Sequence, residues 1–190
     1  MIGDSFMDKY FKLRVAGIER DLPLCKVNDE LYIAAFVIFG DVELTEKTAT
    51  ALLEKAPEFD VIITAESKGI PLGYEMARQS GKPYIVARKA PKLYMRNVVF
   101  THVKSITTAA EQMLCLGSDE IDVIKGKKVL IVDDVISTGE SIAAVVQLVK
   151  EVGGEIAGKM AILAEGDAIE RKDIIALAKL PLFDGEGNEK

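Results

Sequence analysis

The chain has 190 residues, enough for one domain with a full hydrophobic core. Hydrophobic residues make up 49% of it and the mean hydropathy is +0.18, which suits a parallel sheet covered on both faces. The formal net charge of −6 and the pI near 5.0 argue against nucleic acid as a partner. No apolar stretch is long enough to cross a membrane, and two cysteines are too few for a disulfide scaffold, which predicts a cytoplasmic protein.

Strands and helices alternate in the first half of the chain, after an N-terminal extension over 1–30. Apolar runs and helical spacing predict, in order, a strand at Leu31–Phe39, a helix at Val42–Ala56, a strand at Asp60–Ala65 and a helix at Ile70–Ser80. Gly81 and Pro83 mark the end of that second helix, because glycine suits a left-handed C-cap and proline cannot continue a helix.

The second half of the chain continues the alternation. The predicted elements are strands at Pro83–Arg88 and Lys128–Asp133, a helix from Gly139 to about Val152, a strand at Ile156–Ala164, a short helix at Ile169–Ala178 and an edge strand at Leu180–Phe183. The polar tail Asp184–Lys190 is expected to be disordered. Repeated βα units predict an α/β fold, an open twisted mainly parallel sheet with helices on both faces and ligands at the carboxyl ends of its strands.

One connection, Lys89–Lys127, is long for a compact domain, and connections of that length are usually lids or disordered segments. Within it, Thr101–Thr108 is rich in hydroxyl side chains and has little helical periodicity. We therefore expect Thr101–Leu116 to be a flexible lid, because its composition leaves little apolar surface to bury.

Residues 129–141 read VLIVDDVISTGES. The apolar run Val129–Val132 is typical of a strand buried on both faces, and Asp133 and Asp134 follow it directly. Paired carboxylates at a strand end can accept hydrogen bonds from the two hydroxyls of a ribose. Hydroxyls and backbone N–H groups at the start of the next helix suit one phosphate, and they belong to Ser137, Thr138, Gly139, Glu140 and Ser141. The stretch predicts a ribose-5-phosphate site; the alternative is an ordinary capped βα turn.

This stretch resembles the signature of the type I phosphoribosyltransferases: an apolar strand, two acidic residues, a few small or apolar residues, Thr-Gly, one residue, and Ser or Thr. The resemblance implies binding of 5-phosphoribosyl-1-pyrophosphate (PRPP), with Asp133 and Asp134 as catalytic residues on the ribose diol. It implies Mg²⁺ as cofactor, held through substrate oxygens near these two aspartates and not in an all-protein cage. It also implies a homodimer, with PRPP and a purine base as small-molecule partners.

Two other strand ends are similar to the adenine phosphoribosyltransferases within that family. The turn after Asp60–Ala65 resembles the family's pyrophosphate loop, with a lysine in place of the usual arginine: Glu66, Ser67, Lys68 and Gly69. The cations after the third strand resemble an Arg-Lys-x-x-Lys-Leu pattern: Arg88, Lys89 and Lys92. The resemblance implies that Arg88 and Lys92 assist catalysis by stabilising the departing pyrophosphate, and that Lys89 and the turn bind PRPP. The alternative is that both segments are ordinary solvated turns.

The base is indicated by a few positions only. Ser137 is small where hypoxanthine-guanine enzymes carry an acidic residue, which favours adenine. Adenine enzymes, however, use a glutamate in the flexible loop to handle the purine proton, and Glu111 is the nearest candidate here. Its alternative is a solvated hairpin residue. Val103–Thr107 resembles xanthine phosphoribosyltransferases, and His102 lacks the neighbours found in orotate enzymes. Adenine is favoured, with xanthine, hypoxanthine or guanine as alternatives.

A function of another class is a PRPP-sensing regulator without turnover, since one fold can serve both roles. A regulator would carry an added basic DNA-binding segment. Met1–Glu30 holds acidic and basic residues in nearly equal numbers, and so the sequence favours the enzyme.

Overall fold

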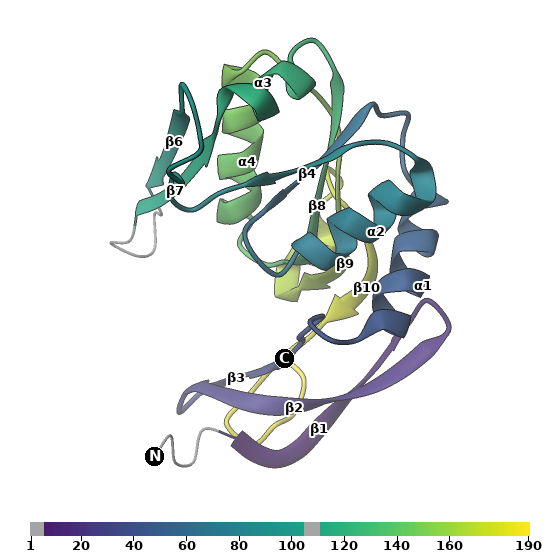
Figure 1. Ribbon diagram of the computed structural model, residues 1–190. Helices are drawn as coiled ribbons and strands as arrows, with labels where there is room; N and C mark the ends of the chain where they lie inside the picture. Colours follow the sequence, from purple (N-terminus) through teal and green to yellow (C-terminus); the bar gives the residue numbers. More distant parts are fainter. Residues whose placement is uncertain (1–5, 105–110) are drawn as a thin grey trace.

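The computed structural model describes the backbone of residues 6–104 and 111–190, and the side chains of 9–101 and 113–190. Figure 1 shows a parallel core sheet with helices on both of its faces, an antiparallel sheet built from both ends of the chain, and a separate hairpin. No helix among these residues is long and apolar enough to cross a membrane.

The core sheet has five strands in the order β10-β9-β8-β4-β5, and every neighbouring pair is parallel. Its strands are β4 (Val61–Ala65), β5 (Tyr84–Ala87), β8 (Lys128–Ile136), β9 (Glu155–Glu165) and β10 (Ile175–Leu180). The chain winds from β4 outward to β5, then returns to β8 and winds the other way. The strand order therefore reverses between β4 and β8, the place where open α/β sheets bind ligands.

Helices cover both faces of this sheet, as the sequence predicts. On one face lie α1 (Val42–Leu53) and α2 (Ile70–Ser80), which pack in one buried cluster with Leu130 and Val132 of β8. On the other face lie α3 (Ser118–Ile124) and α4 (Glu140–Glu151), which share a second cluster with Ile131. Alternate residues of β8 thus serve opposite faces, because strand side chains alternate. The predicted α/β fold class is confirmed.

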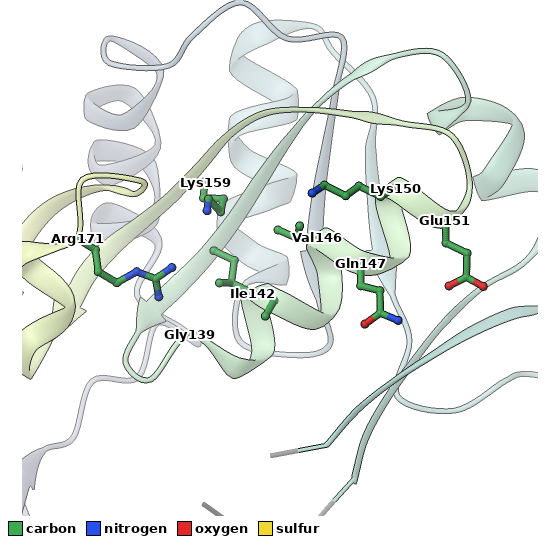
Figure 2. A pocket seen from close by; sticks show the side chains of 9 residues that line it. Gly139, Ile142, Val146, Gln147, Lys150, Glu151, Lys159 and Arg171 are labelled. Carbon is green, nitrogen blue, oxygen red and sulfur yellow. The ribbon is translucent and has the colours of Figure 1, made fainter. Parts of the chain in front are cut away.

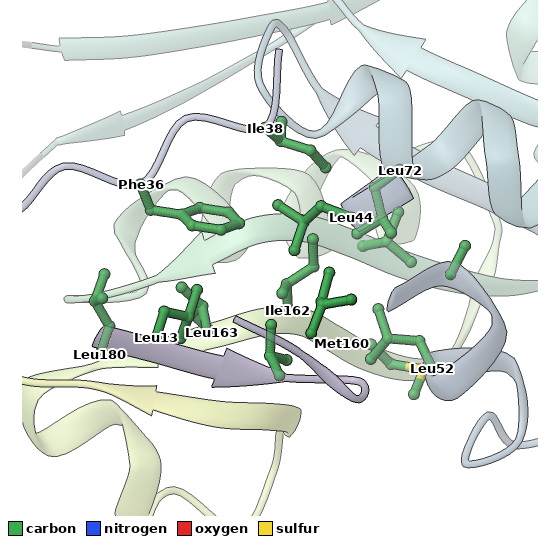
Figure 3. Packing of buried hydrophobic residues seen from close by; sticks show 14 of the residues in the cluster. Leu13, Phe36, Ile38, Leu44, Leu52, Leu72, Met160, Ile162, Leu163 and Leu180 are labelled. Carbon is green, nitrogen blue, oxygen red and sulfur yellow. The ribbon is translucent and has the colours of Figure 1, made fainter. Parts of the chain in front are cut away.

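The N-terminal region is a sheet that the sequence did not predict. The strands β1 (Phe6–Val15), β2 (Ile18–Asn28), β3 (Leu31–Ala34) and β11 (Leu182–Phe183) pair antiparallel in that order. Ala16 and Gly17 both have positive φ, as the tightest hairpin turns require. Leu13 of this sheet packs with Phe36 and with Leu180 of β10, so the two sheets share one core (Figure 3).

The predicted first strand at Leu31–Phe39 is wrong in two respects. Only Leu31–Ala34 is a strand, and it pairs in the antiparallel sheet with β2 and β11. Ala35 still donates its N–H to the Pro23 carbonyl of β2 at 2.9 Å, and after it Phe36 and Ile38 are buried in the core outside any strand, while Phe39 is exposed. An apolar run of nine residues does not reveal which strands it pairs with, or whether it pairs at all.

The C-terminal part also differs from the prediction. The expected helix at Ile169–Ala178 is a short 3₁₀ helix, η1 (Gly166–Glu170), followed by β10, which pairs in parallel with β9. Pairing with an available sheet edge overrides the local helix preference of an alanine-rich segment. Instead of a disordered tail, residues 184–190 form a turn in which the Asp184 carboxylate accepts N–H bonds from Glu186 and Asn188, each at 2.9 Å.

The segment predicted as a lid contains a hairpin of β6 (Val99–Lys104) and β7 (Glu111–Leu116). It is attached to the end of β5, because the backbones of Arg88 and Cys115 exchange hydrogen bonds of 3.0 and 2.8 Å. Residues 105–110 at its tip lie outside the described part of the chain, and the predicted mobility stays a prediction.

Candidate active site

The carboxyl ends of β4 and β8 bring the two predicted ligand-binding loops into contact. Gly69, in the turn after β4, lies so close to β8 that a Cβ built on it would be 3.1 Å from Asp133 Oδ1 and 2.1 Å from Thr64 Oγ1. Only a glycine fits between these groups without a shift. The Glu66–Ser67 peptide bond in the same turn is cis. Because this turn follows β4 and meets the end of β8, the site lies where the strand order reverses.

The paired carboxylates form the centre of this site. Asp134 is buried, with 3% of its surface exposed, whereas Asp133 is half-buried and its Oδ1 accepts the Asp134 N–H at 2.9 Å. Burial, followed by the negative charge of Asp134, raises the pKa of Asp133 above its ordinary value. Two adjacent carboxylates in a poorly solvated place favour a ligand that brings hydroxyl donors or positive charge.

One carboxylate oxygen lacks a hydrogen-bond partner. Lys68 Nζ lies 3.1 Å from Asp134 Oδ2, yet that buried oxygen accepts no hydrogen bond from the described residues. The lysine contact is therefore an ion pair without hydrogen-bond geometry. Half of the Lys68 side chain is exposed. A buried acceptor without a donor is costly in the free protein, and a bound hydroxyl or cation would satisfy it.

The loop after β8 encloses a cavity of about 150 Å³. Its lining includes Asp133 and the whole predicted phosphate segment: Ser137, Thr138, Gly139, Glu140 and Ser141. Gly139 precedes α4 with φ +83°, and its carbonyl accepts the Ala143 N–H at 2.9 Å, the first turn of the helix. The start of α4 and two exposed hydroxyls, on Ser137 and Thr138, thus surround a space of phosphate size.

Glu66 links the turn after β4 to the end of β5. Its carboxylate accepts a bond from the Lys89 N–H at 3.0 Å and another from Arg88 Nη1 at 3.3 Å. The Lys89 N–H, then the Arg88 side chain and the charge of Lys92, lower the pKa of Glu66, although burial opposes them. Both carboxylate oxygens are engaged within the protein, so the observed contacts of Glu66 position the strand ends.

The predicted cations lie around the same strand end. Arg88 Nη2 also donates to Tyr94 Oη at 3.4 Å, while the side chains of Lys89 and Lys92 are exposed. Lys68 stands across the turn, against Asp134. Lys68 thus lies beside the carboxylate pair, and the other cations lie at the end of the neighbouring strand β5; positive charge at both places suits a ligand with several negative oxygens.

Glu111 lies at the start of β7, where its backbone pairs with Lys104. Its side chain falls outside the described residues, as does that of His102. The predicted role of Glu111 in handling a base proton therefore stays a prediction.

One residue that sequence reasoning gave no role is Arg171. Its Nη1 would be 2.1 Å from a Cβ built on Gly139, so the guanidinium packs against the loop that lines the phosphate-sized cavity. A contact between residues more than thirty positions apart has no local signal in the sequence.

Comparison with known proteins identifies a family and relatives of this chain. The family described as "Phosphoribosyl transferase domain" matches residues 43–179, which include every core strand except the last residue of β10. Adenine phosphoribosyltransferase from Thermotoga maritima is 38% identical over 113 residues, 60% of this chain and 62% of that protein. The chain thus spans less than two thirds of that relative. Hypoxanthine/guanine phosphoribosyltransferase from Methanotorris igneus is 32% identical over 76% of this chain and 79% of its own length.

Solved structures of adenine phosphoribosyltransferases share the fold. The one from Leishmania donovani has a TM-score of 0.66 at 19% identity, covering 90% of this chain and 76% of that chain. The one from Rhodothermus marinus has a TM-score of 0.64 at 23% identity, covering 90% and 94%. The family match spans well over half of the sequence and contains the carboxylate pair and both loops. The chain therefore belongs to the phosphoribosyl transferase domain family, of the type I phosphoribosyltransferase fold.

Proposed function

We propose that this protein is a purine phosphoribosyltransferase, which transfers ribose 5-phosphate from PRPP to a purine base, with adenine favoured. The products would be a nucleoside monophosphate and pyrophosphate. The observation that carries the proposal is the pairing of Asp133 and Asp134 with a phosphate-sized cavity that Asp133 also lines. Family membership and the names of the relatives, most of them adenine phosphoribosyltransferases, support it.

The carboxylate pair and the loop after β8 would bind the ribose 5-phosphate part of PRPP. Asp134 Oδ2, which accepts no hydrogen bond from the described residues, would accept one from a ribose hydroxyl, and the half-buried Asp133 would accept one from the neighbouring hydroxyl. The 5-phosphate would take the cavity at residues 137–141, where helix N–H groups and the Thr138 hydroxyl donate to it. Holding both ends of the sugar fixes C1 for attack.

The turn after β4 and the cations after β5 would bind the pyrophosphate. During transfer, the bond between C1 and the pyrophosphate oxygen breaks and a bond from C1 to a base nitrogen forms. Positive charge develops on the sugar and negative charge on the leaving group. Lys68, Lys89 and Lys92 would stabilise the departing pyrophosphate, and Arg88 would do so while it holds Glu66.

We propose Mg²⁺ as the cofactor. The donors at the site fit it, since Asp133 and Asp134 supply carboxylate oxygens, one of which is buried and accepts no hydrogen bond from the described residues. The ion would be bound mainly through oxygens of PRPP, with these two residues beside it, and it would neutralise charge on the pyrophosphate. The residues of the chain position the sugar and exclude water from it.

The experiment that tests the function is a radiolabelled-product assay with PRPP, Mg²⁺ and each of adenine, hypoxanthine, guanine and xanthine. Adenosine monophosphate as main product is the expected result. A 6-oxopurine product would assign the chain to the activity named for the Methanotorris igneus relative. If calorimetry shows PRPP binding but no base gives a product, the assignment as an enzyme would be overturned and a PRPP sensor would be the remaining function.

We also propose a cytoplasmic homodimer. The exposed apolar side chains of Val37, Phe39, Val42 and Tyr74 support it, because Val42 and Tyr74 line a cavity of about 380 Å³ between α1 and α2 that a second copy would cover. Sedimentation equilibrium measures the state directly.

Replacement of Thr138 by valine should weaken binding of a nucleoside monophosphate without loss of stability. Thr138 is exposed, and valine keeps its shape while it removes one hydroxyl donor to the phosphate. A hydrogen bond to a charged group contributes about 1.5–3 kcal/mol, so the dissociation constant should rise by about ten- to a hundredfold. Calorimetry measures it, with Thr138→Ser as the control that keeps the hydroxyl. Equal affinity of wild type and Thr138→Val would remove the hydroxyl from the phosphate site.

Replacement of Glu111 by glutamine tests whether this carboxylate handles the base proton. Glutamine keeps the size and removes the charge. If Glu111 is the proton-handling group, kcat should fall by about a hundredfold, the low end of acid–base contributions, while PRPP affinity stays unchanged. Glu120→Gln, in α3, is the control for a glutamate next to the hairpin. An unchanged kcat would show that Glu111 does not handle the proton, and the next carboxylate to test would be Glu165, at the carboxyl end of β9 in the core sheet.

A further inference from the structure

The guanidinium of Arg171 forms the back wall of the loop that encloses the 150 Å³ cavity. A Cβ on Gly139 would lie 2.1 Å from Arg171 Nη1 and 3.3 Å from its Cζ. Gly139 also adopts φ +83°, a conformation that L side chains rarely adopt. The loop therefore has the 150 Å³ cavity on one side and the Arg171 guanidinium on the other.

Arg171 is held in place by a single carboxylate. Its Nε and Nη2 donate to the two oxygens of Asp173 at 3.0 and 2.9 Å, a bidentate arrangement. Lys159 of β9 donates to the same carboxylate. These two cations hold the pKa of Asp173 well below its ordinary value, so the carboxylate stays charged at neutral pH. Nη1, which faces Gly139, donates no hydrogen bond to the residues that the structure describes.

A large open cavity lies beside this arrangement. It has a volume of about 680 Å³ and runs along α4 from Gly139 past Ile142 and Val146 to Lys150. Figure 2 shows Arg171 and Lys159 on one wall, with the Arg171 side chain extending toward the loop at Gly139. Because the cavity gives the guanidinium room to swing away from the loop, the bond to Asp173 is what keeps it there.

We propose that Arg171 is a positioning residue for the 5-phosphate loop, fixed by Asp173 and, through it, by Lys159. Its guanidinium keeps Gly139 in the left-handed conformation that points the helix N–H groups of α4 into the cavity, and it adds positive potential behind them. Arg171 does not line the 150 Å³ cavity and so acts through the loop. The inference rests on the proposed function, since it names the phosphate of PRPP as the group that the loop binds.

The test compares two ligands that occupy different halves of the site. Ribose 5-phosphate depends on the loop at 137–141, whereas pyrophosphate depends on the turn at 66–69. Asp173→Asn should release the guanidinium and weaken ribose 5-phosphate binding by about tenfold, which corresponds to ~1.4 kcal/mol. Pyrophosphate affinity should stay within about twofold, a difference of ~0.4 kcal/mol. In the assay, KM for PRPP should rise more than kcat falls.

Two more variants complete the series. Arg171→Met removes the cation and should weaken ribose 5-phosphate binding at least as much as Asp173→Asn. Arg171→Lys should restore part of the affinity, because it keeps the charge but not the fork that grips Asp173. The control is Glu58→Gln, which removes the charge from a more exposed ion pair of 2.8 Å with Lys128, at the opposite end of β8. The thermal midpoint of each variant separates misfolding from mispositioning.

The outcomes separate the two proposals. Failure of the wild type to bind ribose 5-phosphate would overturn the proposed function. Binding by the wild type with unchanged affinity in Asp173→Asn and Arg171→Met would overturn the positioning role alone. Equal loss of ribose 5-phosphate and pyrophosphate affinity, or a loss explained by a lower thermal midpoint, would also overturn it, since a merely structural role predicts that result.

Discussion

Asp134→Asn is expected to weaken PRPP binding by about a hundredfold or more, because a buried charged acceptor of ribose hydroxyls becomes a neutral amide. The side chain keeps its size, and its ion-pair partner among the described residues is the half-exposed Lys68 at 3.1 Å. The fold should survive, because the lost ion pair is with a half-exposed lysine and the change removes one of two adjacent negative charges. Titration calorimetry with PRPP and Mg²⁺ measures the affinity.

The control for this change is Asp60→Asn, at the opposite end of the core sheet. Asp60 Oδ2 accepts the Lys128 N–H at 2.9 Å, and an amide oxygen can still do so. The control should bind PRPP as the wild type does. If Asp134→Asn also keeps wild-type affinity, the carboxylate pair is not the diol site and the central assignment is lost.

Gly69→Ala is expected to reduce kcat/KM by about a hundredfold, because a displacement of about 1 Å at a reacting centre has an effect of that size. The new methyl group would lie 2.1 Å from Thr64 Oγ1, 3.1 Å from Asp133 Oδ1 and 3.4 Å from Asp133 Cα. Rotation of Thr64 relieves only the first contact, so the turn must move away from β8. Stability should also fall, by about 1–3 kcal/mol, as in other overpacked sites.

Gly73→Ala is the matched control, since Gly73 lies one turn later in α2 and faces the same threonine. Its Cβ would be 3.4 Å from Thr64 Cγ2, an ordinary contact. Alanine favours a helix over glycine by about 1 kcal/mol, so the thermal midpoint should not fall and kcat/KM should be unchanged. Steady-state kinetics and thermal denaturation of both variants check the pair. Wild-type kinetics in Gly69→Ala would show that the turn is not held against the carboxylates.

Local patterns determined the elements that build the site. The helix predicted at Ile70–Ser80 has those bounds, because Gly81 and Pro83 punctuate it. The apolar run before Asp133 is the central strand β8, and Gly139 precedes α4 as the loop pattern requires. In each case the cause lies within a few residues: burial of a continuous apolar run, a positive φ that only glycine takes easily, or a proline that stops a helix.

Tertiary structure alone decided the pairings between distant segments. The segment at Ile175–Leu180 is a strand because an edge of β9 was open to it, and Leu31–Ala34 joins an antiparallel sheet because β2 and β11 flank it. Lys68 meets Asp134, and Arg171 meets Gly139, across gaps in the sequence that carry no periodic signal. The chain by itself thus specified a strand, two carboxylates and the loop that we propose binds a phosphate. The cation that lies beside the carboxylates depended on strand order. Local sequence patterns do not distinguish one strand neighbour from another, and packing between distant segments makes the choice.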